Sequence, residues 1–252
     1  MLPVAGLVGF VAVGLSLGML GGGGSILAVP VLVNLMDVPA GIAVPMSLPV
    51  VGVAAAAGAA MRWRRGQLRL ATAAIFTLVA MAASYLAARL GAGIPDRPRL
   101  LLFGAAMLVA AVALWRRSQR HPGEMERGGQ PRPAIAVIPA AIVVGALTGV
   151  LGVGGGFLIV PALVGVLGLP MAEATATSLA VIALNTVAAS AGFLTRHVRI
   201  DATVTAMVIA AALVGMALGT VLAPRFSGRT LARWFAVLLV VVAFLTIGKE
   251  VR

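Results

Sequence analysis

Residues 18–33 read GMLGGGGSILAVPVLV, and residues 149–164 read GVLGVGGGFLIVPALV. Ten of these sixteen positions are identical at a constant offset of 131 residues. A glycine cluster followed six residues later by a proline therefore occurs twice, each time inside apolar sequence. We interpret the pattern as an internal duplication in which each half carries a broken helix, and we expect the two breaks to face a shared site.

The composition indicates that the chain lies in a lipid bilayer. Of its 252 residues, 61% are hydrophobic and 10% are charged, whereas a soluble domain is about half apolar and about a quarter charged. A membrane-spanning helix needs about 20 apolar residues. We predict an all-α integral membrane protein with about eight transmembrane helices in two homologous four-helix repeats, the first helix of each repeat broken at its glycine cluster. The candidate segments are residues 4–34, 42–61, 70–90, 99–116, 134–165, 173–194, 202–222 and 230–248.

One long polar stretch, RRSQRHPGEMERGGQPRP at residues 116–133, has the Pro, Gly and mixed charge that are typical of a linker. It predicts a first membrane repeat at 1–116, a cytoplasmic linker at 117–133 and a second membrane repeat at 134–252. Four crossings per half would relate the halves by an axis along the membrane normal, and five would invert them. We favour four, because residues 25–36 would span only about 18 Å as a helix, less than the hydrocarbon core, so that a broken span or a re-entrant piece fits better than an extra crossing.

The basic residues that give the chain its net charge of +12 are unevenly distributed between its loops. With eight spans, both chain ends share one side with the loops at 62–69, 117–133 and 195–201. That side holds thirteen Lys and Arg residues and the other side six, so the positive-inside rule predicts that both termini are cytoplasmic. The first apolar segment lacks a basic leader, and we expect a retained helix rather than a cleaved signal peptide. No basic segment alternates with aromatic residues, so nucleic acid is not an expected partner.

The glycine clusters point to an anion site. Consecutive glycines unwind a helix or let another backbone come close, and Pro30 and Pro161, which we predict as helix-breaking residues, each free the carbonyl four residues earlier. A helix that restarts after the glycines exposes unpaired amides with partial positive charge. The alternative is that the glycines only let helices pack closely. The predicted backbone ligands are Gly21, Gly22, Gly23, Gly24, Ser25, Gly152, Gly154, Gly155 and Gly156.

Polar side chains of the second helix in each half are further candidates. Ser47 and Ser178 are paired by the duplication, and Thr177 and Asn185 make the segment 173–194 unusually polar. These groups would donate to a bound anion, or they would bond to their own helix or join helices. No Asp, Glu or Lys lies near the centre of a span, which disfavours proton or cation coupling through the membrane. We find no metal ligand set, no catalytic pair and no cofactor motif, so an enzyme is not predicted.

The motifs GGGGSILAVP at 21–30, GVGGGFLIVP at 152–161 and ATSL at 176–179 resemble those of the sulfite exporter TauE/SafE family of bacterial membrane transporters. The resemblance covers nearly the whole chain. The first half departs from the family at Met46, where Thr is usual, and at Ala54, which aligns with Asn185. The site is therefore expected to be asymmetric, weighted toward residues 152–185.

The resemblance implies that the substrate is sulfite, an organosulfonate or another small sulfur-containing anion. We predict transport by alternating access between the two repeats, with the small anion and the lipid bilayer as partners. A passive anion channel and a non-transporting structural protein are the alternatives. The sequence does not specify the oligomeric state.

Overall fold

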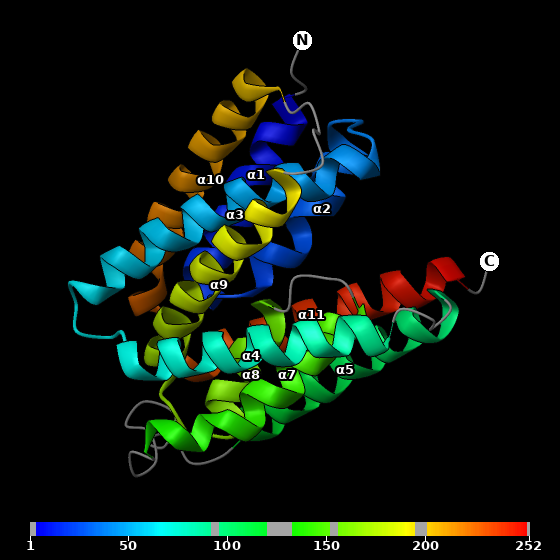
Figure 1. Cartoon of the computed structure of the whole chain (residues 1–252). Coiled ribbons are helices and arrows are strands. Elements are labelled where there is room, and N and C mark those ends of the chain that lie inside the picture. The colour runs from blue at the N-terminus through cyan, green and yellow to red at the C-terminus, as the bar shows by residue number, and fades with distance from the viewer. Residues whose placement is uncertain (1–3, 92–95, 120–132, 152–155, 195–200, 251–252) are drawn as a thin grey trace. The chain divides into compact units, whose positions relative to one another are not determined.

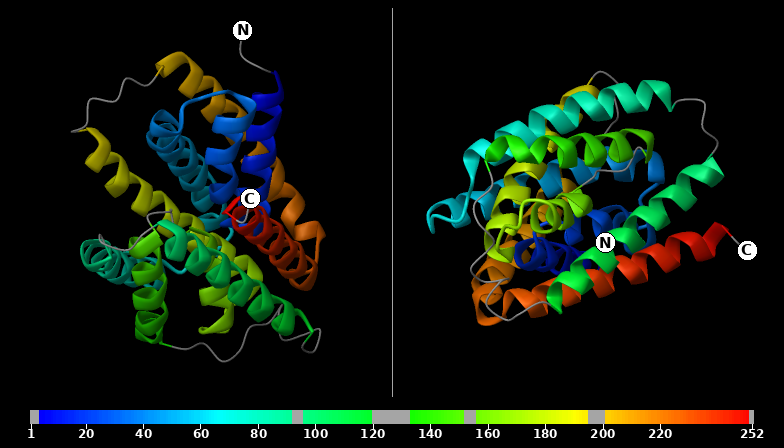
Figure 2. Two further views of the ribbon diagram at one scale, coloured as in Figure 1. Left: turned by 90° about the vertical axis from the view of Figure 1, so that its right-hand side faces the viewer. Right: turned by 90° about the horizontal axis from the view of Figure 1, so that it is seen from below.

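The computed structural model describes residues 4–91, 96–119, 133–151, 156–194 and 201–250. All regular structure in these residues is helical (Figures 1 and 2), as the sequence predicts. The described residues form ten α-helices and two short 3₁₀ helices. The α-helices are α1 Val4–Leu20, α2 Gly23–Leu35, α3 Ala40–Trp63, α4 Leu70–Leu90, α5 Asp96–Ser118, α7 Ile138–Leu151, α8 Gly156–Gly165, α9 Met171–Leu194, α10 Ala202–Leu222 and α11 Gly228–Glu250, and the 3₁₀ helices are η1 Ala134–Val137 and η2 Ala223–Arg225.

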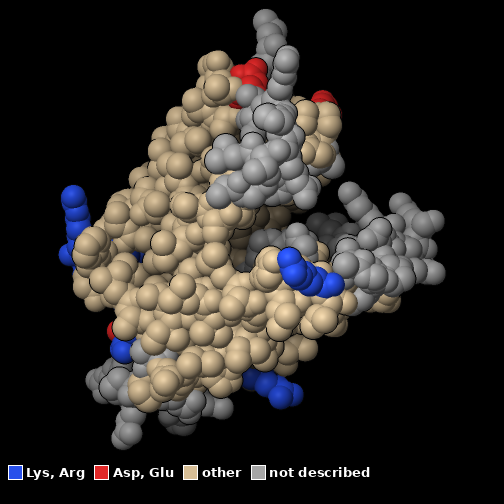
Figure 3. Space-filling model, viewed as in Figure 1, with Lys and Arg blue, Asp and Glu red and all other residues tan. Residues whose placement is uncertain are grey.

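Several helices are long and apolar enough to cross a membrane. Among the described residues, five helical segments satisfy both conditions: Gly41–Trp63, Leu70–Leu90, Leu101–Ser118, Met171–Ser190 and Ala202–Arg225. Many large apolar side chains are exposed on them, including Leu78, Val109 and Val187, and charged side chains are few on the face shown in Figure 3. Apolar surface of this extent suits lipid as the solvent. The membrane class is therefore confirmed, whereas the eight-span count is not.

The described helices gather into two compact units. Unit 1 comprises residues 1–68 and 175–225, and unit 2 comprises residues 69–174 and 226–252. Each unit thus takes helices from both sequence halves: α1, α2 and α3 lie with α10 and most of α9, and α4 and α5 lie with α7, α8 and α11.

In unit 1, glycines hold α1 against α10, and the two helices run parallel (blue and orange in Figures 1 and 2). A Cβ atom at Gly18 would lie 2.6 Å from the carbonyl oxygen of Met216, and one at Gly215 would lie 2.8 Å from the amide nitrogen of Leu15. No side chain larger than hydrogen fits at these positions without displacing backbone. Small residues four apart on both helices produce this close approach, which is a common way for membrane helices to pack.

The same packing recurs in unit 2, where α7 runs parallel to α4. A Cβ atom at Gly145 would lie 2.7 Å from the Cα of Ala80, and one at Gly149 would lie 2.9 Å from the Cα of Ser84. Gly145 and Gly149 are the residues 131 positions after Gly14 and Gly18. The duplicated glycines therefore have duplicated packing partners, and in both cases the partner helix comes from the other half.

The structure corrects the interpretation of the first glycine cluster. A Cβ atom at Gly9 would lie 2.8 Å from Val31, Gly6 approaches Met36, and Gly24 approaches Leu17. The helix after the glycines therefore runs back along α1, and α1 and α2 form an antiparallel hairpin. The sequence left a broken span and a re-entrant piece open for residues 4–34, because glycines signal an interruption and not the direction in which the chain continues. The hairpin agrees with the re-entrant piece.

The prolines do not break the helices. Helix α2 continues through Pro30 and α8 continues through Pro161, so the prediction of helix breaks at these two residues is wrong. A proline inside a helix removes one backbone hydrogen bond without having to end it. The Asn34 side-chain amide donates to the carbonyl of Pro30 at 2.9 Å. In the first half the interruption lies earlier, at Gly21 and Gly22.

The last helices of the two halves are antiparallel in unit 2. The side chain of Arg233, near the start of α11, donates to the hydroxyl of Ser118, at the end of α5, over 3.5 Å. Its guanidinium also lies 5.8 Å from the ring centre of Trp115. Four crossings per half would make these equivalent helices parallel. Their antiparallel packing fits instead the additional reversal of the α1–α2 hairpin, and the four-crossing arrangement that helix length favoured is not confirmed.

Candidate substrate site

The tip of the α1–α2 hairpin depends on glycine. Gly21 has φ = +78°, a conformation that glycine adopts without strain. A Cβ atom there would lie 2.7 Å from the Cα of Thr175 and 2.8 Å from the hydroxyl oxygen of Ser178. The Gly21 amide closes the last turn of α1 by donating to the Leu17 carbonyl at 2.8 Å. The turn therefore forms against α9, a helix from the other half of the chain.

Side chains donate hydrogen bonds to the carbonyl groups at the end of α1. The Ser178 hydroxyl donates to the Gly21 carbonyl at 2.6 Å and lies 3.1 Å from the Thr175 carbonyl. The Arg62 guanidinium donates to the Gly18 carbonyl at 2.6 Å. Arg62 is only 4% exposed, and a cation at a helix C-terminus is favoured by the helix dipole. Both groups stabilise the end of α1 where its own hydrogen bonds stop.

The amide end of α2 lacks such partners. Gly22 precedes the helix and provides no side-chain cap, while the Ser25 hydroxyl donates back to the Gly22 carbonyl at 2.7 Å. Among the described residues, no carbonyl outside the helix accepts from the amides of Gly23, Gly24 or Ser25. Gly21 to Gly24 are all buried. The start of α2 thus presents unpaired donors with partial positive charge inside unit 1, which is the property of an anion site.

The corresponding turn of the second half is only partly visible. Gly152, Gly154 and Gly155 lie outside the described residues. Gly156 is buried and begins α8, and Pro161 is buried within it. The predicted participation of these glycines stays a prediction.

The predicted side-chain ligands on α3 and α9 differ in what they contact. Ser47 is 7% exposed and donates to the carbonyl of Val44 in its own helix at 2.8 Å. Thr177 is fully buried and has a partner in the structure. Asn185 is half-buried, and its carbonyl oxygen has no hydrogen-bond partner among the described residues. Ser178 is the predicted residue that the structure brings to a glycine turn.

Sequence reasoning missed Arg62 as a residue of the hairpin tip. It was counted among the loop charges, although it lies within α3, two residues after Ala60 and one before Trp63. The signal was a charge inside an apolar helical segment, where a buried partner is needed. In the part of the chain that the structure describes, His, Asp and Glu form no group of three that would hold a metal ion.

Comparison with known proteins places these features in a family. The model of the sulfite exporter TauE/SafE family matches residues 5–246. Two relatives, each called a probable membrane transporter protein, come from Xylella fastidiosa strains 9a5c and Temecula1 / ATCC 700964. Each is 34% identical to this chain, and the similarity covers 97% of this chain and 93% of the relative. No solved structure is significantly similar. The chain therefore belongs to the sulfite exporter TauE/SafE family of membrane transporters.

Proposed function

We propose that the protein moves a small anion, sulfite or an organosulfonate, across the bacterial inner membrane. The observation that carries the proposal is the start of α2, where buried glycine amides have no cap in the described structure. Backbone amides bind oxyanions through partial positive charges, so that a bound anion is also able to leave.

At the hairpin tip, the carbonyl end of α1 has hydrogen-bond partners and the amide end of α2 does not, in the described structure. Ser178 and Arg62 satisfy the carbonyls that end α1, and these carbonyls would otherwise repel an anion at the adjoining start of α2. The Asn185 side chain is half-buried, and its NH2 group is a hydrogen-bond donor for an anion, while its oxygen has no partner in the described structure. None of the seven carboxylates of the sequence lies near the middle of a membrane-spanning helix, so an anion at that depth meets no like charge there.

Alternating access between the two repeats is the proposed means of moving the anion.

Flux across liposomes tests the proposal. The purified protein is reconstituted, and uptake is measured for sulfite, sulfoacetate, thiosulfate, sulfate and acetate. We expect flux of sulfite or sulfoacetate above that of protein-free vesicles, with acetate slowest. Flux of no anion by a folded, inserted protein would contradict transport. Counterflow of labelled substrate against an unlabelled gradient is expected for a carrier, and its absence would favour a passive channel.

The Ser25→Ala variant probes the proposed site with little structural change. Ser25 is half-buried and bonds only to Gly22 in the described structure, so its removal alters the first turn of α2 without opening a large cavity. We expect a higher KM for the anion. Gly41→Ala is the matched control, because a Cβ atom at Gly41 meets nothing within 4 Å, and its flux is expected to be unchanged. An equal KM for the two variants would place the anion elsewhere.

A further inference from the structure

The reversal in the first hairpin decides which helix ends share a membrane face. Because α2 runs back along α1, the chain returns at residues 36–39 to the side on which α1 begins. Helices α3, α4 and α5 then cross three times. Each half therefore makes an odd number of net crossings, and the end of α5 lies on the side opposite the start of α1.

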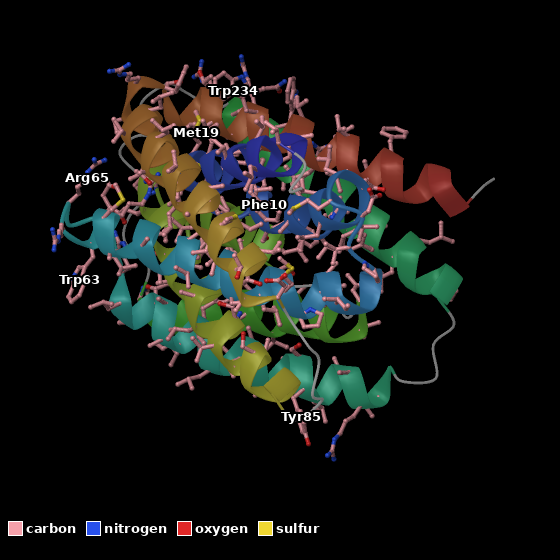
Figure 4. All side chains as sticks on the ribbon, turned by 90° about the horizontal axis from the view of Figure 1, so that it is seen from above. Phe10, Met19, Trp63, Arg65, Tyr85 and Trp234 are labelled. Carbon is pink, nitrogen blue, oxygen red and sulfur yellow. The ribbon has the colours of Figure 1, made fainter. Side chains whose placement is uncertain are left out.

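Hydrogen bonds within each unit support this assignment independently. In unit 1, the Arg65 side chain, after the end of α3, donates to the Thr220 carbonyl near the end of α10 at 3.2 Å. Figure 4 shows Arg65 and Trp63 projecting outward at this end of α3. Helices α3 and α10 thus end on the same face. Under eight crossings they would end on opposite faces.

In unit 2, three contacts also join helix ends that this topology places on the same membrane face. Arg69 forms an ion pair with Glu173, which joins the start of α4 to the start of α9. The Arg117 side chain donates to the Gly165 carbonyl at 3.2 Å, which joins the ends of α5 and α8. The contact of Arg233 with Ser118 joins the start of α11 to the end of α5. Every one of these pairs would be split between opposite membrane faces by an eight-crossing chain.

The basic residues are unequally divided between the two faces defined in this way. Of the thirteen Lys and Arg residues among the described residues, nine belong to the helix ends on the side where α5 ends, and four belong to the other side. The nine, which we name the arginine face, are Arg62, Arg64, Arg65, Arg69, Arg116, Arg117, Arg225, Arg229 and Arg233. The four are Arg89, Arg97, Arg99 and Lys249.

We infer that the arginine face is the cytoplasmic surface of the protein, where it meets the anionic headgroups of the inner leaflet. Short loops rich in Lys and Arg stay in the cytoplasm, and the negative surface potential of that leaflet attracts such residues. The start of α1 and the end of α11 then face outward. This is the reverse of the orientation that eight crossings predicted, and it holds whichever anion the protein moves.

Single cysteines test the orientation in a chain that contains none of its own. Three variants are made: Gln119→Cys after α5, Ala202→Cys at the start of α10 and Ser227→Cys before α11. All three positions are exposed. Spheroplasts are treated with a membrane-impermeant maleimide, and total reactivity is measured after detergent permeabilisation, with the size-exclusion profile as the control for folding.

The inference requires labelling at residue 202 and protection at residues 119 and 227. Protection at 119 and 202 with labelling at 227 would restore the eight-crossing arrangement and overturn the inference. Protection at 202 with labelling at the other two would keep the topology and reverse its orientation, which also overturns it. Protection at 227 with labelling at 119 and 202 would contradict both the topology and the orientation.

Discussion

At the scale of single residues, the hairpin tip is held by a few contacts made far along the sequence. Gly21 and Ser178 are 157 residues apart and lie in direct hydrogen-bond contact. The sequence predicted both as site residues because the duplication pairs and repeats them. It did not predict the hydrogen bond between Gly21 and Ser178. Each half has both a glycine cluster and a serine at the duplicated position, so the sequence does not say which serine contacts which glycine turn.

The hydroxyl of Ser178 gives a prediction for stability. In the Ser178→Ala variant the buried Gly21 carbonyl loses its donor, and we expect a loss of about 1–3 kcal/mol in the free energy of unfolding. Ser47→Ala is the matched control, because Ser47 is the duplicate residue and bonds only within its own helix. Thermal unfolding in detergent measures both. Equal melting temperatures would remove Ser178 from the hairpin tip.

Alanine substitutions at Gly21 and Gly66 distinguish the cost of backbone strain from the cost of steric overlap. Both have positive φ, +78° and +70°, but a Cβ atom at Gly66 meets nothing within 4 Å. We expect Gly66→Ala to lose about 1–2 kcal/mol through strain alone. Gly21→Ala should lose about 1–3 kcal/mol more, because the methyl group overlaps the Thr175 backbone. If both variants melt at the same temperature, the turn is not packed against α9.

At the scale of helices, the glycines both pack helices closely and interrupt a helix, two roles that the sequence presented as alternatives. Gly14 and Gly18 let α1 approach α10, and Gly145 and Gly149 let α7 approach α4. Gly21 forms a turn. Close packing therefore explains the glycines within α1 and α7, and the chain reversal explains Gly21. The length of residues 25–36 correctly excluded a full span, but length does not give the direction of a helix.

The two helix pairs should respond alike to the same substitution. A Cβ atom at Gly14 would lie 2.8 Å from the amide nitrogen of Met216, and one at Gly145 would lie 2.7 Å from the Cα of Ala80. We expect Gly14→Ala and Gly145→Ala each to lower the free energy of unfolding by about 1–3 kcal/mol through overpacking. Gly41→Ala, in open space, should be neutral or stabilising by up to about 1 kcal/mol. A neutral Gly145→Ala would show that α7 does not approach α4 this closely.

At the scale of the whole molecule, each compact unit contains helices of both halves. Helix α1 depends on α10, and α7 depends on α4, so neither half completes its own packing. Composition and the repeated glycines were enough to predict an all-helical membrane protein of this family. The exchange of helices was beyond sequence reasoning, because the small residues that permit it occur on every candidate partner.

The reversal at Gly21 is the central structural claim, and a disulfide tests it most directly. In the Gly9→Cys/Val31→Cys variant the two residues lie in contact, and an otherwise cysteine-free chain gives no background. A continuous helix through residues 9–31 would separate them by about 33 Å, far beyond the reach of a disulfide. After mild oxidation in membranes, the account predicts that the monomer loses reactivity with a polyethylene glycol maleimide and regains it on reduction, whereas Gly9→Cys/Gly41→Cys stays reactive. Full reactivity of both variants after oxidation would contradict the hairpin.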